Sequence, residues 1–316
     1  SLQPPPRWLR RRPPGLLPLY PIAIETLDLR EFDLVISSSG AWSKGIVTRL
    51  HTRHIAYLHS PMRYAWEVSE QYVGEVLPCF VPRLVARLWL SYIRLWDLQA
   101  ALRPDVLIAN SLYTQTRIEK YYRKESIVVY PPALGLAEHH RAERESLLHR
   151  EYFLVVSRLT QSKKITPVIE AFNKLGFPLV IVGTGRELPS HHHIAESNIS
   201  FVGRVSDARL RRYYQEARAV IFPSEEDFGM VAVEALSFGT PVIAYEYGGI
   251  REILQVGVTG ETFRSQTPEV IAEAVKRFLE KEVAGEYVDE VLRASVAHFS
   301  REAFETGIRR VVEGEV

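Results

Sequence analysis

Short apolar runs alternate with amphipathic segments along most of this 316-residue chain. Residues 33–39 and 53–59 are typical, since each run ends in small or polar side chains, as buried strands of a parallel sheet do. The same pattern predicts strands at 105–111, 126–132, 151–157, 178–183, 199–203, 219–223 and 241–245. Helical spacing predicts helices at 82–101, 111–122, 166–175, 206–216, a segment ending at 238, 268–281 and 300–313. This alternation predicts an α/β fold with parallel sheets.

The alternation falls into two blocks. At roughly 100–200 residues per domain, the length also favours two domains. Pro131 and Pro132 stop the last strand of the first block, and a polar, charged stretch follows them. The predicted organisation is an amino-terminal domain over 1–138, a linker over 139–150, a doubly wound carboxyl-terminal domain over 151–298 and a terminal helix within 299–316.

Charge and cysteine content exclude several classes of protein. Lys plus Arg number 39 and Asp plus Glu 38, so the formal net charge is +1. This balance argues against a nucleic-acid binder, and any anion must be bound locally. The single cysteine, Cys79, excludes an internal disulfide and a cysteine-rich zinc site. It favours a reducing compartment, and we expect a cytoplasmic protein.

The basic, proline-rich start does not match a secretory signal, because prolines interrupt its apolar part. The longest apolar stretch, 77–101, is interrupted by arginines, which argues against a membrane-spanning helix. Its helical part is predicted to be a core helix rather than an interfacial one. Arg7 and Arg10–Arg12 near Trp8 suit anionic lipid, so peripheral contact with the inner face of a membrane is an additional expectation.

One strand, turn and helix hold the most informative chemistry. After the strand that ends at Pro223, Asp227 is predicted to cap a helix, with Glu226 in the turn and Glu234 inside the helix. Backbone N–H groups at the start of such a helix favour phosphate or hydroxyl ligands. The alternative interpretation is a capping aspartate beside two solvated glutamates, and residue types alone leave both open.

The order of motifs resolves this choice. Glu226 and Glu234 lie in E-D-F-G-x-x-x-x-E-A, which is followed by G-T-P-V-I-A and G-G-I-R-E. This pattern resembles the donor-binding motif of retaining GT-B glycosyltransferases of family 4. Residues 157–163, S-R-L-T-Q-S-K, are similar to the family's G-R-L-x-x-x-K, with Ser157 in place of glycine. The resemblance covers about residues 151–313.

The amino-terminal half resembles the bacterial mannosyltransferase branch of the same family. Residues 59–67, H-S-P-M-R-Y-A-W-E, are similar to H-T-P-M-R-Y-A-W-D of enzymes that build exopolysaccharide, O-antigen or lipid-linked saccharides. I-A-N-S at 108–111 and Y-P-P at 130–132 agree. Family members open with a strand and a glycine-rich turn that this sequence does not show, so we expect the first βαβ portion to be absent from it.

The resemblance implies two Rossmann-like domains facing a cleft, with the donor on the carboxyl-terminal domain and the last helix crossing back. A departing nucleoside diphosphate gains negative charge, which cations must stabilise. The resemblance therefore implies a catalytic set of His59, Arg158, Lys163 and Glu226, with Glu226 on the donor sugar. It implies a donor-binding set of Phe228, Gly229, Met230, Val231, Glu234 on the ribose and Val205 at the base. Arg63, Tyr64 and Trp66 are assigned to the acceptor side, with core packing as an equal alternative.

No metal and no cofactor beyond the donor are expected. The sequence has no Asp-x-Asp pair, and His191–His193 lie in a predicted polar loop without carboxylates at ligand spacing. The resemblance implies a hexosyltransferase that moves mannose from GDP-mannose, or a hexose from a UDP-sugar, to a saccharide or lipid-linked acceptor. The alternatives are a non-catalytic nucleotide-sugar-binding remnant and a GT-B nucleotide-sugar epimerase.

Overall fold

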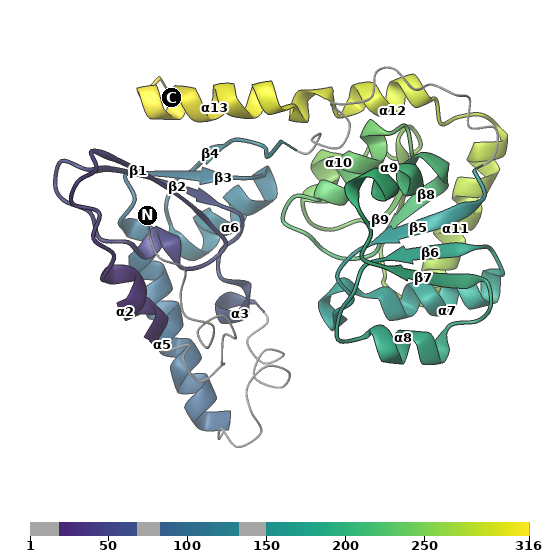
Figure 1. Ribbon diagram of the computed structural model, residues 1–316, viewed down its shortest axis with the longest axis horizontal. Coiled ribbons are helices and arrows are strands. Elements are labelled where there is room, and N and C mark those ends of the chain that lie inside the picture. Colours follow the sequence, from purple (N-terminus) through teal and green to yellow (C-terminus); the bar gives the residue numbers. More distant parts are fainter. Residues whose placement is uncertain (1–18, 68–82, 133–149, 316) are drawn as a thin grey trace. The chain divides into compact units, whose positions relative to one another are not determined.

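The computed structural model describes residues 19–67, 83–132 and 150–315, and the chain forms two compact units that divide between Val129 and Tyr130 (Figure 1). We call them unit 1 and unit 2. Several sequence features lie outside the described residues: Arg7, Trp8, Arg10–Arg12, Cys79 and residues 139–149 of the predicted linker.

Unit 1 is built on a four-stranded parallel sheet in the order β1-β2-β3-β4. Its strands are β1 (Leu34–Ser39), β2 (Arg53–Leu58), β3 (Val106–Ala109) and β4 (Ile127–Val128). Its helices are α2 (Tyr20–Glu25), η2 (Ser43–Gly45), α3 (Arg63–Trp66), α5 (Arg83–Leu102) and α6 (Leu112–Tyr122). Helix α6 begins where the Ser111 side chain accepts a hydrogen bond from the Thr114 amide, at 2.9 Å.

A buried ion pair lies within unit 1. Lys44 of η2 and Asp97 of α5 are completely buried, and Lys44 Nζ lies 2.5 Å from Asp97 Oδ1. Trp66 Nε1 and the Tyr122 hydroxyl both donate to Asp97 Oδ2, at 2.8 and 2.7 Å. Burial lowers the pKa of Lys44, while the Asp97 charge opposes that shift. The pair therefore joins η2, α3, α5 and α6 through one carboxylate.

Unit 2 is a doubly wound domain with a six-stranded parallel sheet in the order β10-β9-β8-β5-β6-β7. Its strands are β5 (Tyr152–Val156), β6 (Leu179–Val182), β7 (Ile199–Gly203), β8 (Ala217–Phe222), β9 (Val242–Tyr245) and β10 (Gly260–Phe263). The first strand, β5, pairs with both β6 and β8, so the strand order reverses between β5 and β8. Ligands of such sheets bind outside the carboxyl ends of the strands at this switch point.

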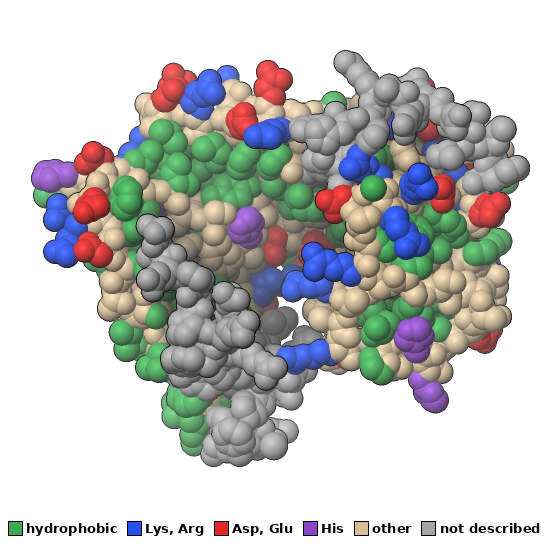
Figure 2. Space-filling view, in the orientation of Figure 1, with side chains coloured by type: hydrophobic (Ala, Val, Ile, Leu, Met, Phe, Trp, Pro, Cys, Tyr) green, Lys and Arg blue, Asp and Glu red, His purple; other side chains and the backbone are tan. Residues whose placement is uncertain are grey.

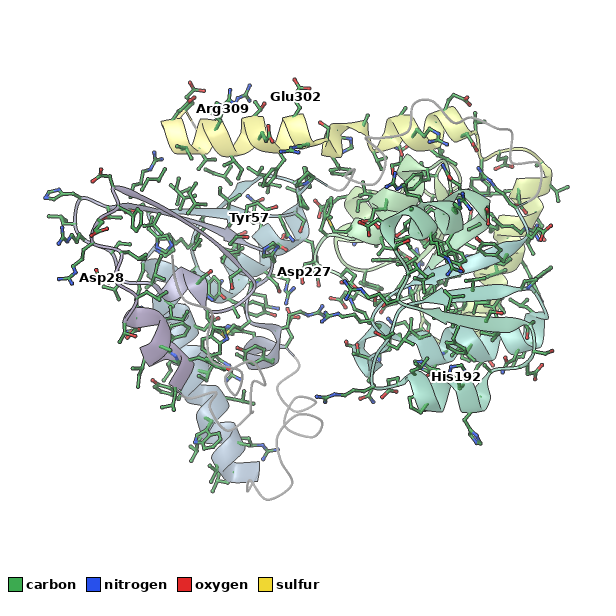
Figure 3. All side chains as sticks on the ribbon, viewed as in Figure 1. Asp28, Tyr57, His192, Asp227, Glu302 and Arg309 are labelled. Carbon is green, nitrogen blue, oxygen red and sulfur yellow. The ribbon has the colours of Figure 1, made fainter. Side chains whose placement is uncertain are left out.

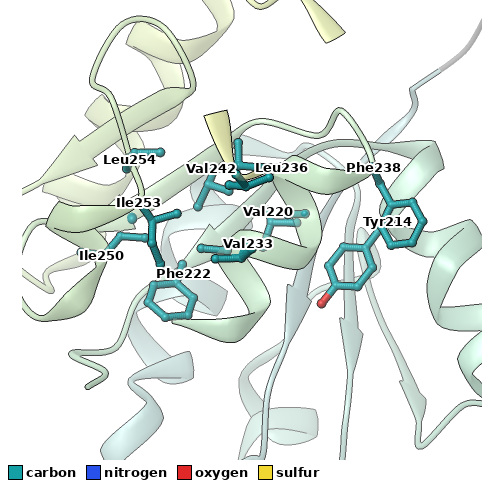
Figure 4. Packing of buried hydrophobic residues seen from close by; sticks show 14 of the residues in the cluster. Tyr214, Val220, Phe222, Val233, Leu236, Phe238, Val242, Ile250, Ile253 and Leu254 are labelled. Carbon is teal, nitrogen blue, oxygen red and sulfur yellow. The ribbon is translucent and has the colours of Figure 1, made fainter. Parts of the chain in front are cut away.

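Helices cover both faces of the unit 2 sheet. They are α7 (Ile165–Leu175), α8 (Leu188–Ile194), α9 (Asp207–Glu216), α10 (Met230–Ser237), α11 (Pro268–Val283) and α12 (Asp289–Ser295), with 3-10 turns η3 (Gln161–Lys163), η4 (Gly249–Glu252) and η5 (Ala297–Phe299). The last helix, α13 (Arg301–Glu313), follows η5. Phe153 packs toward α7 and α11, whereas its neighbour Leu154 packs toward α9, α10 and α12. Figure 4 shows the buried cluster on the face covered by α9, α10 and α12, where Tyr214 stacks on Phe238. The predicted crossing of α13 stays a prediction.

Every predicted strand overlaps an observed one, and two local expectations are wrong. His191–His193 belong to α8 and not to a loop. Helix α10 begins at Met230 with Gly229 as its N-cap, so Asp227 does not cap it. Strand β10 was not among the predicted strands. Glu261 is only 3% exposed, and Lys281 Nζ neutralises it at 2.8 Å.

Among the described helices, none is both long and apolar enough to cross a membrane.

Candidate active site

The predicted cation and carboxylate of unit 2 meet at the switch point. Lys163 lies in η3 after β5, and Glu226 lies in the turn after β8. Lys163 Nζ forms an ion pair with Glu226 Oε1, and the Ser224 hydroxyl donates to the same oxygen at 2.9 Å. Both side chains of the pair are partly exposed, at 18% and 27%. The pair is therefore oriented and still accessible to a ligand.

The loop that carries Arg158 packs closely on the loop after β6. The Ser157 and Leu159 amides donate to Val182 and Thr184 carbonyls, each at 3.0 Å. A Cβ at Gly185 would lie 2.0 Å from the Leu159 carbonyl oxygen, so only glycine allows this approach. Arg158 itself is exposed, and within the described part of the chain its guanidinium pairs with no carboxylate. The packed loops therefore hold a cation ready for an anionic ligand.

Gly248 and Gly249 support the turn that carries Glu226. Gly248 forms a parallel bridge with Glu226, and the Gly249 amide donates to the Glu226 carbonyl at 2.9 Å. Gly248 has φ +97, and a Cβ there would lie 2.4 Å from the same carbonyl oxygen. This glycine pair begins the sequence motif G-G-I-R-E. Its role in the structure is to let two backbones approach.

The start of α10 completes this side of unit 2. Gly229 adopts φ +112 and directs the chain into a helix whose first N–H groups have no acceptor within it. Phe228 is 3% exposed and packs on Tyr130 and Phe299, so its side chain belongs to the core. Met230 is 41% exposed. What the turn presents to a ligand is therefore mainly backbone. Asp227 is labelled in Figure 3.

Glu234 lies one turn into α10 and pairs with Tyr214 of α9. The Tyr214 hydroxyl donates to Glu234 Oε2 at 2.7 Å. Burial raises the pKa of Glu234, and the charge of Asp207 raises it further, while the hydrogen bond from Tyr214 lowers it. Val205, in the loop between β7 and α9, is half-buried against the same core cluster. The predicted ribose and base positions thus share the α9 side of α10.

His59 ends the β2 segment of unit 1. Its Nε2 lies 3.0 Å from the Ser38 hydroxyl of β1, and its ring meets Tyr57 edge-on at 5.4 Å. Tyr57 is labelled in Figure 3. Partial burial lowers the pKa of His59, although the residue keeps an exposed surface. A lowered pKa favours the neutral imidazole, which can accept a proton at one ring nitrogen and donate a hydrogen bond from the other.

The three predicted acceptor-side residues contact other parts of unit 1. Arg63 Nε lies 3.5 Å from Glu67 Oε2, and the Tyr64 hydroxyl donates to Met62 Sδ at 3.2 Å. The Trp66 indole stacks on Tyr121 with ring centroids 5.0 Å apart, and its N–H is bonded to Asp97. Tyr64 and Trp66 both also pack against a core cluster of unit 1.

The histidines of α8 are also engaged within unit 2. His191 is buried, with Nε2 3.2 Å from the Thr166 hydroxyl, and His192 packs on Phe201 at 4.3 Å. The described residues contain no group of three or more His, Cys, Asp or Glu side chains that could hold a metal ion.

Comparison with known proteins identifies a family for this chain. A family model described as glycosyl transferases group 1 matches residues 136–294, half of the chain. An uncharacterized glycosyltransferase from Methanocaldococcus jannaschii is 24% identical over 223 residues, which cover 68% of this chain and 61% of that protein. The match thus spans less than two thirds of that relative's length.

Two solved structures share the fold. Sucrose-phosphate synthase from Thermosynechococcus elongatus has a TM-score of 0.73 and 17% identity, over 100% of this chain and 81% of that one. HepE from Anabaena, in complex with UDP, has a TM-score of 0.66 and 17% identity, over 94% and 82% of the two chains. Since the family model matches half of its length and both units are Rossmann-like, this chain belongs to the group 1 glycosyl transferases and has the GT-B fold.

Proposed function

We propose that the protein is a retaining hexosyltransferase of family 4. It transfers mannose from GDP-mannose, or alternatively a hexose from a UDP-sugar, to a saccharide or lipid-linked saccharide. The observation that carries the proposal is the Lys163–Glu226 ion pair at the switch point of unit 2, beside the start of α10. HepE was solved with UDP, which supports a nucleoside diphosphate as the ligand class.

Each residue of this site has a chemical task. Breaking the bond between sugar and diphosphate concentrates negative charge on the diphosphate, and Arg158 and Lys163 stabilise that charge. Backbone N–H groups from Phe228 to Val231 add donors to the same phosphates. Glu226 then accepts hydrogen bonds from the donor sugar, and Glu234 accepts them from the ribose hydroxyls.

The proposed mechanism needs no carboxylate nucleophile. The acceptor hydroxyl attacks the anomeric carbon on the face from which the diphosphate departs, and its proton passes to a departing phosphate oxygen. Configuration is thereby retained without the paired carboxylates of glycosidases. His59 is proposed to lie near the reacting sugar, with Arg63 and Tyr64 toward the acceptor. The scheme requires no metal ion.

We also propose that unit 1 contacts an anionic membrane at the cytoplasmic face, where a lipid-linked acceptor would be found. On α5, Leu84, Leu88, Tyr92 and Leu95 are 70%, 61%, 47% and 67% exposed, and green side chains follow α5 at the lower left of Figure 2. Arg87 and Arg94 lie on the same helix, and its one acidic residue, Asp97, is buried. An apolar stripe with arginines suits an anionic interface.

Vesicle flotation tests the membrane contact. Leu88→Glu and Leu95→Glu should each reduce binding to vesicles that contain phosphatidylglycerol. Val283→Glu is the control, because Val283 is 87% exposed but lies in unit 2. Equal flotation of all variants would contradict this contact.

Calorimetric titration with GDP, UDP and their hexose conjugates tests the donor site. Lys163→Ala and Glu234→Ala should each weaken binding at least about ten-fold, as expected for charged hydrogen bonds. Lys174→Ala is the matched control, because Lys174 forms an exposed ion pair with Glu269 at 2.6 Å. Wild-type protein that binds no nucleotide, or variants that bind like wild type, would refute the proposed site.

Turnover separates the proposed enzyme from its alternatives. A transferase releases nucleoside diphosphate faster when an acceptor is present, and Lys163→Ala should slow that release by about two to three decades. An epimerase would convert the donor without acceptor, and a non-catalytic remnant would bind the donor unchanged. Only the acceptor-dependent release agrees with the proposal.

A further inference from the structure

Unit 1 contains a buried arginine that contacts both ends of the segment following His59. Arg117 of α6 is 4% exposed. Its Nη1 donates to the Ser60 hydroxyl at 3.2 Å, and its Nε lies 2.7 Å from Glu67 Oε1. Ser60 directly follows His59, and Glu67 follows α3. One guanidinium on a regular helix therefore links the two ends of residues 60–67.

Further hydrogen bonds fix the two partners of Arg117, Glu67 and Ser60, in place. The Tyr121 hydroxyl, one turn further along α6, donates to Glu67 Oε1 at 3.0 Å. The Ser60 hydroxyl donates to the Pro61 carbonyl at 2.8 Å, and Ser60 is only 8% exposed. A buried guanidinium is costly unless its geometry and partners are well defined. The rigid fork of arginine suits two contacts in different directions, which the single ammonium of lysine cannot reproduce.

His59 is held from a second element. Its backbone amide donates to the Ser39 carbonyl at 3.2 Å, and its Nε2 lies 3.0 Å from the Ser38 hydroxyl. Both of these contacts come from β1. The ring is therefore oriented by β1, while the chain that leaves His59 is oriented by α6 through Ser60.

We infer that Arg117 is a positioning residue for His59, acting through Ser60 and Glu67 and not through contact with substrate. The inference rests on the proposed function for its catalytic meaning, because that proposal assigns His59 to the reacting sugar. The structural part of the inference does not depend on the proposed function. If the Arg117 guanidinium is lost, residues 59–61 are no longer held by it, and His59 becomes more solvated.

The test measures the His59 pKa by NMR in the full chain, with the resonance assigned by its loss in His59→Gln. In Arg117→Lys and Arg117→Gln the His59 pKa should rise toward the ordinary value of about 6.5 as solvation increases. Arg117→Lys keeps the positive charge, so a rise there reports geometry. Arg103→Gln is the matched control, since Arg103 pairs with Glu25 at 2.6 Å elsewhere in unit 1.

Ser60→Ala covers the case in which the Arg117 variants fail to fold. It removes one hydroxyl, keeps the Arg117–Glu67 pair and should shift the His59 pKa in the same direction. An unchanged His59 pKa in folded Ser60→Ala overturns the inference, and so does an unchanged His59 pKa in folded Arg117→Lys. So does a shift in Arg117→Gln alone, which would indicate a charge effect.

Measurements of activity and donor binding distinguish a failure of this inference from a failure of the proposed function. If wild type turns over, Arg117→Lys should lower kcat about ten-fold or more while the donor Kd stays unchanged. A fall in donor affinity at constant kcat contradicts the inference. If wild type shows no turnover, the proposed function fails, and the NMR titration still decides whether Arg117 positions His59.

Discussion

At the scale of single residues, Glu234, which we propose to bind the ribose, opposes the stability of the fold near neutral pH. Burial raises its pKa above the ordinary 4.5. A carboxyl whose pKa is higher in the folded state contributes stability below its unfolded pKa, and this contribution is lost as pH rises through the folded pKa. Near neutral pH the ionised Glu234 carboxylate therefore lowers the stability of the folded state. Under the proposed function, this charged carboxylate accepts hydrogen bonds from the ribose hydroxyls.

Glu234→Gln tests this conflict. Glutamine can still accept the Tyr214 hydrogen bond without the buried charge. We expect the free energy of unfolding of the variant, relative to wild type, to increase from about pH 4 to about pH 8 in urea titrations. Nucleotide affinity should fall about ten-fold. A variant that is relatively less stable at the higher pH would contradict the argument.

At the scale of elements, the β8–α10 turn depends on a neighbouring segment. Gly248 and Gly249 contact its backbone so closely that no side chain fits between them. The position of Glu226 therefore depends on η4 as much as on β8.

Gly248→Ala should destabilise unit 2 by more than about 2 kcal/mol, because it adds a clash with the Glu226 carbonyl to the cost of positive φ. It should also abolish nucleotide binding. Gly176→Ala is the control, with φ +71 and nothing within 4 Å of the added Cβ. That variant should cost about 1 kcal/mol. Similar unfolding free energies for the two variants in urea would exclude the close-approach argument.

In unit 1, the buried Lys44–Asp97 ion pair holds several elements together. Asp97→Asn should destabilise unit 1 by about 3–5 kcal/mol, because it leaves Lys44 charged and buried without its counterion. Chemical denaturation monitored by the tryptophans measures this loss. Asp28→Asn, which breaks an exposed pair with Arg30, should cause no measurable change. An Asp97→Asn variant as stable as wild type would contradict the role of the pair.

At the scale of the whole molecule, the two units carry separate groups of proposed site residues. Arg158, Lys163, Glu226 and Glu234 lie in unit 2, whereas His59 lies in unit 1. A nucleoside diphosphate without its sugar should therefore engage unit 2.

Hydrogen exchange measured by mass spectrometry checks this division. Saturating GDP or UDP should slow exchange in residues 157–163 and 224–234, because ligand binding stabilises the state that binds it. Strands β2 and β3 should exchange at unchanged rates. Protection confined to unit 1 would show that the nucleotide binds elsewhere.

Much of the fold was predictable, because it depends on local patterns. Runs such as 178–183 and caps such as Ser111 and Ser206 are encoded within a few residues, and the strands and helices they predict are present. The predicted cap at Asp227 is wrong, because an aspartate caps a helix only where the chain enters that helix. In the structure the positive φ of Gly229 delays that entry.

The α/β class, the family resemblance and the choice of Lys163, Glu226 and Glu234 as candidate residues of unit 2 were all evident in the amino-acid sequence. Which side chains contact one another is visible only in the folded chain. Lys163 pairs with Glu226 and Tyr214 with Glu234 in unit 2, and Arg117 contacts Ser60 and Glu67 in unit 1. Hydrophobic periodicity and capping depend on neighbours in sequence. Pairings between residues 20 to 63 positions apart in the sequence depend on strand order and close backbone packing, which no local pattern records.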